Sequence, residues 1–519
     1  MDLISASKDT NQEFFEGLYL SAFPDDERIE IESLYDLYRQ NLIEIYIINE
    51  NDKNIGFAVI YLNENIHLLS YFAIDPRYRG RGFGSMALKK LKEKGFEAYI
   101  VGGCVRDKFI GVEPEDYDIT TSAKPEEIKE VFRDFKNILI GEKYGTVGVL
   151  INKKLYEITT FRIDGKYLNF RKPESVIFSD NLTEDLKRRD FTINAMAIDE
   201  SGKVYDPFGG KDDLREKTIR AVGDPIKRIR EDAIRIMRAI RFAGRLDFYI
   251  DEELFDAISA ERELLKKISP ERIFEEFSKM ITSDRPSSYL LIMEETGVLD
   301  VIFPELKRTV GFNQFSPFHD KTLFDHLLCV MDEVKPDLTL RLAALFHDIS
   351  KVDTLTIGDD GRGHFYGHEI LGADVVAEIL KRYRVSNKII DKVRILILDH
   401  MKVHSEMSDK ALRRQIKRVG RENVEDLYDL LIADCKCTRA DRDASFIINR
   451  KNRVKKLLEE KEMKTEKFLD IDGNIIKSMG FKEGRIIGEI LSDLEGLVLD
   501  DPSKNNREYL MKYIENNYR

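Results

Sequence analysis

The stretch "AYIVGGCVRDKFIGVEPEDYDITT", residues 98–121, combines a short apolar run, a glycine pair and closely spaced acids. Residues 98–101 are apolar and predict a strand. Gly102 and Gly103 follow at once, and backbone N–H groups in such a turn can approach a phosphate while Arg106 supplies positive charge. The stretch therefore predicts an α/β domain that binds a phosphate-bearing ligand.

Two acids complete this stretch. Asp116 and Asp118 stand at i and i+2, a spacing that directs both side chains to one face of an extended chain. Neighbouring carboxylates repel, so the pair calls for a cation, and Mg²⁺ suits oxygen ligands that share it with substrate phosphates. Glu157, in the strand-like "YEITTFR", offers a third carboxylate. Three acids can hold metals on both sides of an in-line phosphoryl displacement, although a lone D-x-D is common by chance.

Motifs further along the chain strengthen the interpretation of these acids as a metal site that acts on a phosphate-bearing ligand. "LKRRDFTINAMAID" (186–199) contributes Arg188, Arg189, Asp190 and Asn194, and "YDPFGGKDDL" follows it. "RIREDAIRIMRAIRFAGRLDF" (228–248) is expected to form a helix that places one acid and three arginines along one face; these are Asp232, Arg235, Arg238 and Arg241. A solvated helix face is the alternative interpretation of the charges alone.

In order and content, the motifs of residues 97–300 resemble the bacterial class II tRNA nucleotidyltransferases, the family of CCA-adding enzymes and poly(A) polymerases. The resemblance implies that Asp116 and Asp118 bind Mg²⁺, with Glu157 as third catalytic carboxylate. It also implies a protein template, in which Asp232 and Arg235 pair with the Watson–Crick edge of incoming C or A; an arginine offers donors and a carboxylate acceptors. The implied nucleotide-binding residues are Gly102, Gly103, Arg106, Arg189, Asp190, Asn194, Asp232, Arg235, Arg238 and Arg241.

The resemblance implies an enzyme that transfers CMP and AMP from CTP and ATP to the 3′ end of tRNA. "FRIDGKYLNFRKPESV" (161–176) resembles the flexible loop of enzymes that add all of CCA, with Asn169 where an acid is expected. The chain carries no basic tail of the kind expected in a poly(A) polymerase. CCA addition is favoured, and A-only addition or poly(A) synthesis are the alternatives.

A second cluster of candidate ligands lies in the C-terminal half. Seven of the eight histidines fall between residues 319 and 404, in "FDHLLCVMDEV", "LAALFHDISK", "HFYGHEILGA" and "LILDHMKVH". Their order, with a later Asp in "LLIADCK", resembles the HD-domain phosphohydrolases, in which such residues bind divalent metal and activate water. The predicted second metal site consists of His326, His347, Asp348, His368, His400 and Asp434. His364 is an alternative to His368, and His404 is an alternative to His400. A phosphohydrolase acting on RNA 3′ ends is the second function considered; individually satisfied histidines in an RNA-binding region are the alternative.

The N-terminal segment contains another glycine motif. "LLSYFAIDPRYRGRGFGSMALKKL" resembles the acetyl-CoA loop of GNAT acyltransferases, where a strand leads to backbone amides that bind pyrophosphate. The implied loop residues are Arg79, Gly80, Gly82 and Gly84. The chain then passes directly into "GFEAYIVGG", so the last part of a GNAT fold is expected to be missing and acetyl-CoA binding is doubtful. The helix at about 85–94 is expected to be shared by the two folds.

Composition restricts the remaining choices. The formal net charge is −12, yet residues 220–245 carry eight Lys or Arg against three acids, which suits one local phosphate-bearing ligand. Four cysteines are too few for a disulfide framework, which favours a cytoplasmic protein. No apolar run is long enough for a membrane span, and the oligomeric state stays open.

The predicted fold class is multidomain α/β plus all-α: a truncated GNAT-like segment, an α/β nucleotidyltransferase head with a mixed sheet, then a helical neck, an HD-type helical domain and a helical tail. The expected boundaries are 1–94 for the GNAT-like segment, 95–220 for the catalytic head, 221–310 for the neck that templates nucleotides and binds RNA, 311–440 for the HD-type domain, and 441–519 for the tRNA-binding tail.

Three local expectations accompany these boundaries. In the N-terminal segment, "IEIYIINE", "NIGFAVIYL" and "IHLLSYFAI" predict three strands. Gly244 is expected to interrupt the helical pattern that begins at about residue 225. Near the end, "DGNIIKSMGFKEGRIIGEILSDLEGLVLDDP" predicts helices separated by glycine turns.

Overall fold

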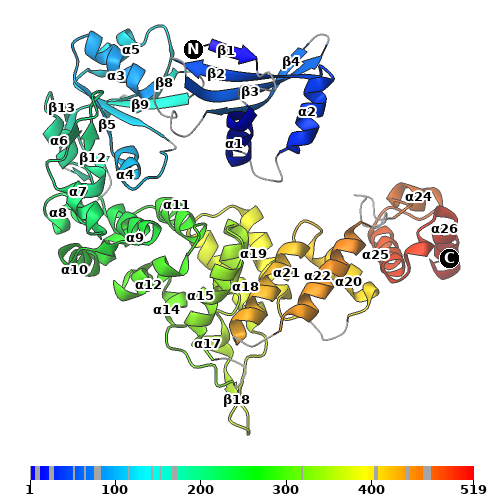
Figure 1. The fold of residues 1–519 in the computed structure, drawn as a ribbon. Helices are drawn as coiled ribbons and strands as arrows, with labels where there is room; N and C mark the ends of the chain where they lie inside the picture. Colours follow the sequence, from blue (N-terminus) through cyan, green and yellow to red (C-terminus); the bar gives the residue numbers. More distant parts are fainter. Residues whose placement is uncertain are drawn as a thin grey trace. The chain divides into compact units, whose positions relative to one another are not determined.

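The protein is described from a computed structural model (Figure 1). The described residues are 2–5, 12–22, 28–50, 53–63, 66–74, 83–114, 116–141, 144–151, 154–165, 167–168, 172–316, 320–402, 407–439, 443–459 and 469–518. They divide into two compact units, one made mainly of residues 1–163 and the other mainly of residues 208–519. Each unit is considered by itself.

The N-terminal segment forms a four-stranded antiparallel sheet in sequential order. Its elements are β1 Asp2–Ser5, α1 Gln12–Ala22, α2 Ile31–Arg39, β2 Ile43–Glu50, β3 Lys53–Asn63 and β4 Ile66–Ile74. The alternation in "IEIYIINE" buries Ile43, Ile45 and Ile47, because successive side chains of a strand point to opposite faces. This sheet confirms the three predicted strands.

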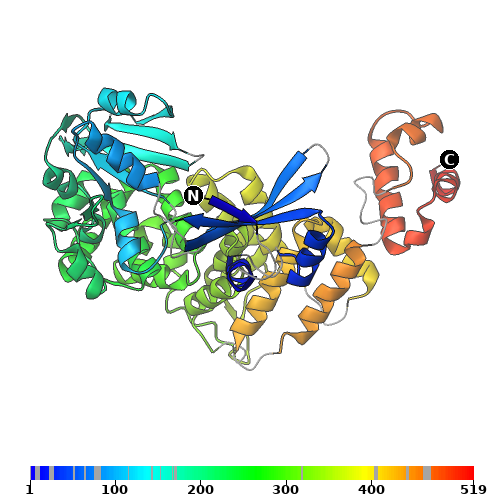
Figure 2. The same cartoon turned by 45° about the horizontal axis from the view of Figure 1, so that its top comes forward.

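The head is a seven-stranded mixed sheet in the order β15-β14-β5-β6-β9-β8-β7 (Figure 2). Strands β6 and β9 pair in parallel, and the other recorded pairs are antiparallel. The strands are β5 Ala98–Val101, β6 Asp118–Thr121, β7 Lys136–Gly141, β8 Thr146–Ile151, β9 Lys154–Thr160, β14 Ala197–Ile198 and β15 Val204–Tyr205. Its helices are α4 Gly103–Phe109, α5 Pro125–Val131 and α6 Leu182–Lys187, and the short strands β10 Arg162–Asp164, β11 Tyr167–Leu168, β12 Lys172–Pro173 and β13 Val176–Phe178 follow β9.

The helix that joins the two folds is α3, Phe83–Glu93. Its buried residues Ala87, Leu88 and Leu91 belong to the hydrophobic core of the head, together with Ile119 and Phe132. The core of the N-terminal sheet is a separate cluster. The apolar face of α3 therefore stabilises the head, in accord with the expectation of a helix at the junction.

From residue 208 the chain is mostly helical. Its helices are α7 Gly210–Arg215, α8 Pro225–Glu231, α9 Ile234–Leu246, α10 Glu252–Glu261, α11 Pro270–Ile281, α12 Ser287–Glu295, α13 Val298–Ile302, α14 Pro304–Lys307, α15 Leu323–Glu333, α16 Leu338–Phe346, α17 Lys351–Thr354, α18 His368–Arg382, α19 Asn387–Asp399, α20 Asp409–Val419, α21 Val424–Thr438 and α22 Ser445–Leu458. Two short strand pairs interrupt them, β16 Thr218–Ile219 with β17 Tyr249–Ile250, and β18 Thr356–Ile357 with β19 Gly363–His364. One continuous apolar core extends from Phe191 to Leu457.

Two local predictions in this half are wrong. Asp232 was expected on the helix with the three arginines, but it has an extended backbone (φ −142°, ψ 103°) between α8 and α9. Gly244 was expected to interrupt the helical pattern, yet it lies within α9. A Cβ there would stand 2.5 Å from the ring of the buried Tyr289, so Gly244 permits close packing of α9 on α12. Close approach, and not chain reversal, explains this glycine.

The cysteines were expected to form no disulfide framework, but one pair is joined. Cys329 on α15 is bonded to Cys437 on α21, across a sequence separation of 108 residues. Cys104 and Cys435 are buried and are not part of a disulfide. Helix packing brings the joined pair together, and a spacing of 108 residues gives no signal of this in the sequence.

The tail contains α24 Gly473–Ser478, α25 Arg485–Asp500 and α26 Arg507–Tyr518. Its apolar residues form their own cluster, which includes Ile476, Leu494 and Leu510. The predicted glycine turns are confirmed at Gly480 and Gly484, which have positive φ angles. Among the described helices, none has the length and apolar character needed to cross a membrane.

Candidate functional site

Three carboxylates of the head lie at neighbouring strands. Asp118 begins β6, and in the parallel β6–β9 pair it is opposite Glu157. Asp116 lies two residues before β6, so the extended strand predicted for both aspartates includes only Asp118. Partial burial, with added repulsion from Asp118 and Asp116, raises the pKa of Glu157. The three predicted acids therefore interact electrostatically, as expected for an oxygen-rich cation site.

The glycine turn precedes α4 at the same end of the head. Gly102 has a φ of 85°, in the left-handed region that favours glycine, and its N–H donates to Met196 O. Arg106 is only 3% exposed. Its guanidinium donates to Asn194 Oδ1 at 2.7 Å and to Asp107 Oδ1 at 2.7 and 2.8 Å. The structure thus joins two predicted nucleotide-binding residues, Arg106 and Asn194, and adds Asp107.

In the other unit, Asp190 and Arg238 form an ion pair. Both Nε and Nη2 of Arg238 donate to Asp190 Oδ2, at 2.8 and 2.5 Å. Asp190 is 9% exposed, and its charge raises the pKa of Arg238. The adjacent Arg189 is half-buried. Two predicted residues from different segments are therefore brought together.

The two proposed template residues each have a different partner. Asp232 accepts from Arg272 of α11, with Nη2 at 2.9 Å from Oδ2. Arg235 is 9% exposed and donates to Glu231 Oε2 at 2.8 Å and to the backbone oxygen atoms of Arg228 and Arg188. The side chains of Asp232 and Arg235 are thus each held by a further charged residue.

Three charged partners were not predicted from the sequence. Arg272 holds Asp232, Glu231 holds Arg235, and Glu276 accepts from Arg241 Nε at 2.6 Å. Glu231 was detectable as the acid adjacent to Asp232. Arg272 and Glu276 lie on α11, in the ordinary amphipathic pattern "PERIFEEFSKMI", which gives no sign of their role.

The histidine cluster of the helical half brings together all six predicted ligands. His326 lies on α15, His347 and Asp348 follow α16, His368 begins α18, His400 follows α19 and Asp434 lies on α21. In the described part of the chain, two groups of ligand atoms within 4.8 Å of one another occur, and both are here: His326 with His347 and Asp434, and Asp348 with His368 and His400. The three head carboxylates do not form so close a group.

Asp348 links the two groups. Its Oδ2 lies 3.3 Å from His347 Nε2 and 3.7 Å from His326 Nε2. Its Oδ1 lies 3.0 Å from His368 Nε2 and 3.4 Å from His400 Nε2. A residue that the sequence did not single out, the buried Lys351, places its Nζ 2.6 Å from Asp348 Oδ2.

The four imidazoles share one orientation. Each Nδ1 faces a backbone carbonyl oxygen, at 2.9 Å for His347, 2.6 Å for His368 and His400, and 3.4 Å for His326. A carbonyl accepts the Nδ1 proton and leaves the Nε2 lone pair directed into the cluster, which is how metal-binding histidines are commonly held. Among the described residues, His347 Nε2 and Asp348 Oδ1 are buried without a partner in hydrogen-bond geometry. The donor set fits a divalent metal.

The electrostatics of the cluster are mixed. Burial opposes ionisation of Asp348, but His347 and Lys351 outweigh it and hold the pKa of Asp348 well below its usual value. Burial also opposes the charge of His347, yet Asp348 and Asp434 raise its pKa. Burial lowers the pKa of His400. The cluster therefore keeps Asp348 negative and His400 neutral, the forms that metal ligation requires. The raised pKa of His347 instead favours its protonated form beside the two carboxylates.

The predicted acetyl-CoA loop is largely outside the described residues. Arg79, Gly80 and Gly82 fall there, as does Asn169 of the flexible loop. Gly84 lies in the first turn of α3. The structure therefore places only one residue of this loop.

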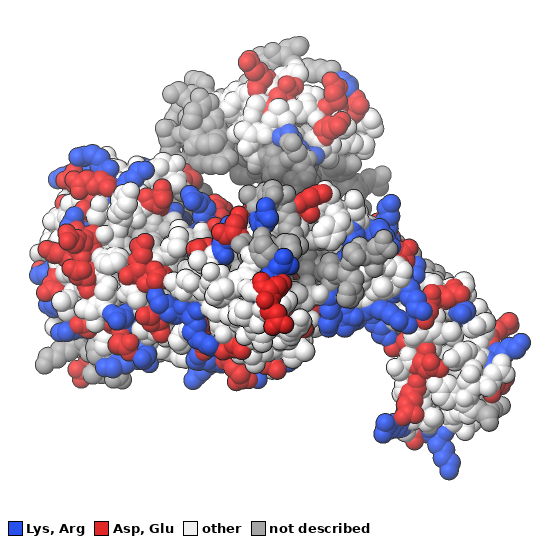
Figure 3. Space-filling model, turned by 90° about the horizontal axis from the view of Figure 1, so that it is seen from below, with Lys and Arg blue, Asp and Glu red and all other residues white. Residues whose placement is uncertain are grey.

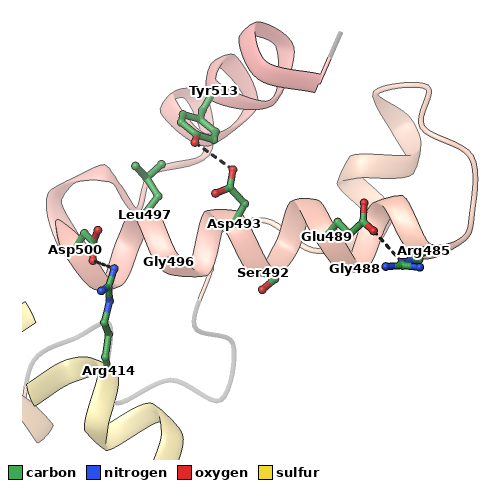
Figure 4. Close-up of a pocket in the computed structure, with 10 residues that line it drawn as sticks. All are labelled: Arg414, Arg485, Gly488, Glu489, Ser492, Asp493, Gly496, Leu497, Asp500 and Tyr513. Atoms are coloured by element: carbon green, nitrogen blue, oxygen red, sulfur yellow. Dashed lines mark hydrogen bonds and ion pairs between the residues drawn. The ribbon is translucent and has the colours of Figure 1, made fainter. Parts of the chain in front are cut away.

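A cavity of about 920 Å³ lies along α25 (Figure 4). Gly488, Ser492 and Gly496 form its floor, and Arg414 of α20 reaches Asp500 at its edge, with Nη2 2.6 Å from Oδ1. None of the predicted site residues lines it. Helix α20 is basic, with Lys410, Arg413, Arg414, Lys417 and Arg418 among its eleven residues. Basic side chains also gather on part of the face that Figure 3 views. Lys410 and Lys417 of α20 pair with Asp500 and Glu495.

Comparison with protein families divides the chain consistently with these sites. The poly A polymerase head domain matches residues 98–220, and the probable RNA and SrmB-binding site of polymerase A matches residues 247–309. The HD domain matches residues 323–442, and the acetyltransferase (GNAT) family matches residues 8–115. The match of the poly A polymerase head domain to the residues of the mixed sheet gives the class of the chain, a nucleotidyltransferase, and its nucleotidyltransferase and HD domains both imply divalent metals.

Similar proteins give the narrower assignment. The CCA-adding enzyme of Levilactobacillus brevis is 34% identical over 435 residues, which are 82% of this chain and 96% of that protein. The chain belongs to the family of CCA-adding enzymes. That of Lactobacillus helveticus is 45% identical over 257 residues, 49% of this chain and 64% of that protein. The crystal structure of the Bacillus stearothermophilus CCA-adding enzyme in complex with CTP is 27% identical, with a TM-score of 0.65, and covers 86% of this chain and 99% of that one.

Proposed function

We propose that this chain adds CMP and AMP from CTP and ATP to the 3′ end of tRNA, through the carboxylates of its head. The observation that supports this most is the register of β6 and β9, which places Asp118 opposite Glu157. The Bacillus stearothermophilus structure, which contains CTP, supports the same choice of substrate. The tRNA partner, and a cytoplasmic location, follow from this function.

Asp116 and Asp118, with Glu157, would hold Mg²⁺. The hard carboxylate oxygens match the preference of that ion. Partial burial, and after it repulsion from Asp118 and Asp116, raises the pKa of Glu157, which a bound cation would counteract. When bound, the metal would lower the pKa of the primer 3′ hydroxyl and neutralise charge on the leaving pyrophosphate. The residues themselves orient the two reacting groups in line.

Gly102 and Gly103, with Arg106, would bind the triphosphate. The backbone N–H groups after Gly102 are available to phosphate oxygens at the start of α4. Arg106 is nearly buried and already donates to Asn194 and Asp107, so its contribution is to hold the turn and the local positive charge in place.

Asp232 and Arg235 would read the base, Arg189 and Asp190 would contact the nucleotide, and Arg238 and Arg241 would add contacts to the nucleotide or its phosphates. A carboxylate offers acceptors and a guanidinium donors, so together they can match the edge of C or of A after a small rotation. The ion pairs to Arg272 and Glu231 hold each side chain, and a base would have to compete with them.

The test uses purified protein and tRNA transcripts that end before CCA, after C or after CC. Labelled CTP and ATP are supplied separately and together. We expect incorporation of C, C and A in order, and its loss in the Asp116→Ala plus Asp118→Ala variant. Incorporation of A alone on the CC transcript would indicate A-only addition, and long A tails would indicate a poly(A) polymerase.

A second activity is favoured by the histidine cluster. We propose that the HD domain binds a divalent metal and hydrolyses a phosphoester at an RNA 3′ end. His326, His347, Asp348, His368, His400 and Asp434 would hold the metal. When bound, the metal would supply an activated water. The orientation of all four Nε2 atoms into one cluster supports this proposal.

This activity is separable from nucleotide addition. The His347→Ala plus Asp348→Ala variant should lose metal-dependent release of phosphate from RNA ending in a 2′- or 3′-phosphate, or opening of a 2′,3′-cyclic phosphate, and keep incorporation. The head variant should show the reverse. Hydrolysis that survives the cluster substitutions would contradict the assignment.

Acetyl-CoA binding at Arg79, Gly80, Gly82 and Gly84 stays a prediction. The GNAT family match supports a common origin of this segment with acyltransferases. Isothermal titration of the full chain with acetyl-CoA tests it, and Gly82→Asp is the control variant.

A further inference from the structure

A pair of stacked rings, one exposed and one half-buried, lies near the histidine cluster in the chain. The rings of His364 and Tyr366 are parallel within 3°, with centroids 5.6 Å apart. Tyr366 is 79% exposed, the highest value among the exposed large hydrophobic side chains in the described part of the chain. Neither residue is one of the six predicted ligands. The ring pair, His364 with Tyr366, is therefore a surface that the proposed metal site does not involve.

The segment that carries the ring pair is fixed to the cluster. Phe365, between the two rings, accepts at its backbone oxygen from Nδ1 of the ligand His368, at 2.6 Å. The ring of Phe365 lies 5.3 Å from Lys351 Nζ, and Lys351 pairs with Asp348. The ring pair is thus tied to two cluster residues, His368 and Asp348, through one neighbour.

A second set of contacts holds the same hairpin. Gly363 N–H donates to Phe315 O at 2.8 Å, and a Cβ on Gly363 would come within 2.5 Å of Gln314 O. Gln314 in turn accepts from Lys351 Nζ at 3.1 Å. Close backbone packing on one side and Lys351 on the other therefore position the ring pair relative to the cluster.

The distance to the cluster is short. Only Gly367 lies between Tyr366 and His368, so their Cα atoms are at most about 7 Å apart. Aromatic side chains exposed beside a phosphate-binding centre offer what a nucleobase needs, because every base has a π-face that stacks without regard to sequence. We propose that the HD site acts on a nucleotide, with the phosphate at the cluster and the base stacked on the ring pair.

The surrounding charges favour a base over a phosphate on the rings. The loop between β18 and β19 carries Asp359 and Asp360, and Arg362 is already paired with Asp360, with Nε 3.4 Å from Oδ2. Glu369 follows His368 on α18. These acids repel a phosphate but not a neutral ring. The inference rests on the proposed function only in taking a phosphoester as the substrate at the cluster. Stacking of a base on the ring pair can be measured without any hydrolysis.

The kinetic experiment compares adenosine 2′,3′-cyclic phosphate with ribose 2,3-cyclic phosphate, which lacks the base, on the full-length protein. For Tyr366→Ala we expect KM to rise about ten-fold for the adenosine compound, within the roughly 5- to 150-fold range of one lost stacking contact. We expect kcat to change less than about two-fold and the base-free substrate to be unaffected. Tyr366→Phe should restore KM. Equal effects on both substrates, or none, would overturn the proposal.

A binding experiment needs no hydrolysis. The chain contains no tryptophan, so Tyr366→Trp introduces a single indole whose fluorescence a stacked base should quench. We expect saturable quenching by adenosine 2′-phosphate and none by ribose 5-phosphate. Phe446→Trp, at a ring 46% exposed that packs near Arg450 of the same helix, is the control.

The two experiments fail independently. Quenching without hydrolysis would keep the base-stacking site and contradict the proposed phosphohydrolase. Hydrolysis with no quenching, and with an unchanged KM in Tyr366→Ala, would overturn the base-stacking site alone. A change of oligomeric state in Tyr366→Ala, measured by sedimentation, without an effect on nucleotides would assign the rings to a protein interface and would also overturn it.

Discussion

At the scale of single residues, the two clusters treat their carboxylates in opposite ways. In the head, Asp116, Asp118 and Glu157 face one another, and partial burial with this repulsion raises the pKa of Glu157. In the HD domain, Asp348 lies among imidazoles and Lys351, and its pKa is held low. The first cluster is incomplete without a cation, whereas the second already contains one in Lys351.

We predict that Glu157→Gln stabilises the metal-free protein near neutral pH, because it removes a carboxylate whose pKa is raised by partial burial and by repulsion from its neighbours. The gain should be less than about 1 kcal/mol, because much of the side chain is still exposed and water screens its charge. The raised pKa means that the favourable contribution of protonated Glu157 is complete below 4.5 and is lost as pH rises through the folded-state pKa. Thermal unfolding in EDTA should therefore show a higher Tm for the variant than for the wild type near neutral pH. Below pH 4.5 the two proteins should have the same Tm. Added Mg²⁺ should stabilise the wild type more than the variant, which keeps Asp116 and Asp118 but lacks the third carboxylate; a variant less stable at neutral pH would contradict this.

The sequence predicted the head residues better than their partners. Asp118 was identifiable by its spacing from Asp116 after the glycine turn, and Glu157 as an acid in a strand-like segment; strand register then placed them side by side. Arg272 and Glu276 could not be found, because their role depends on how α11 packs against α9. Gly244 was misread for the same reason: only the position of Tyr289 distinguishes close packing from a helix break.

At the scale of elements, close helix contacts and one covalent link hold the helical half together. Gly244→Ala should destabilise the protein by about 0.5–2 kcal/mol, because overpacking costs about 1–3 kcal/mol and the better helix propensity of Ala returns up to about 1. The Cβ would meet the Tyr289 ring at 2.5 Å. Gly488→Ala in α25, where nothing lies within 4 Å, is the matched control and should be neutral or stabilising. Urea unfolding of both variants measures the difference.

The Cys329–Cys437 link connects α15 and α21, the helices that carry His326 and Asp434. Cys329→Ser should lower the free energy of unfolding by about 2–4 kcal/mol under oxidising conditions, because the link closes a long loop in the unfolded chain. In reductant, variant and wild type should differ by less than about 1 kcal/mol. An equal difference in both conditions would show that packing at Cys329, and not the link, accounts for the loss.

At the scale of the whole molecule, the chain has separate cores with separate tasks. The N-terminal sheet, the head and the tail each have their own apolar cluster, while the neck and HD segment share one. Helix α22 belongs to that shared core through Ile447, Val454 and Leu457. The head carboxylates and the histidine cluster therefore lie on different cores, whereas the predicted template residues of the neck share the core of the HD segment. Substitutions of Asp116 and Asp118 should for this reason leave the histidine cluster intact, and the reverse.

The tail provides the clearest test of this arrangement. The pairs Lys410–Asp500, Arg414–Asp500 and Lys417–Glu495 join α20 to α25, and their side chains are 30–52% exposed. Exposed ion pairs contribute about 0–1 kcal/mol each, and the apolar tail cluster contains no residue of the shared core.

A chain ending at residue 459 should therefore unfold within a few degrees of the Tm of the full chain. We expect its KM for full-length tRNA to rise about ten-fold, because the tail is predicted to bind tRNA. A short acceptor-stem substrate should be extended equally by both proteins. Loss of extension on that short substrate would show that the tail supports the catalytic head, and would contradict the division into separate cores.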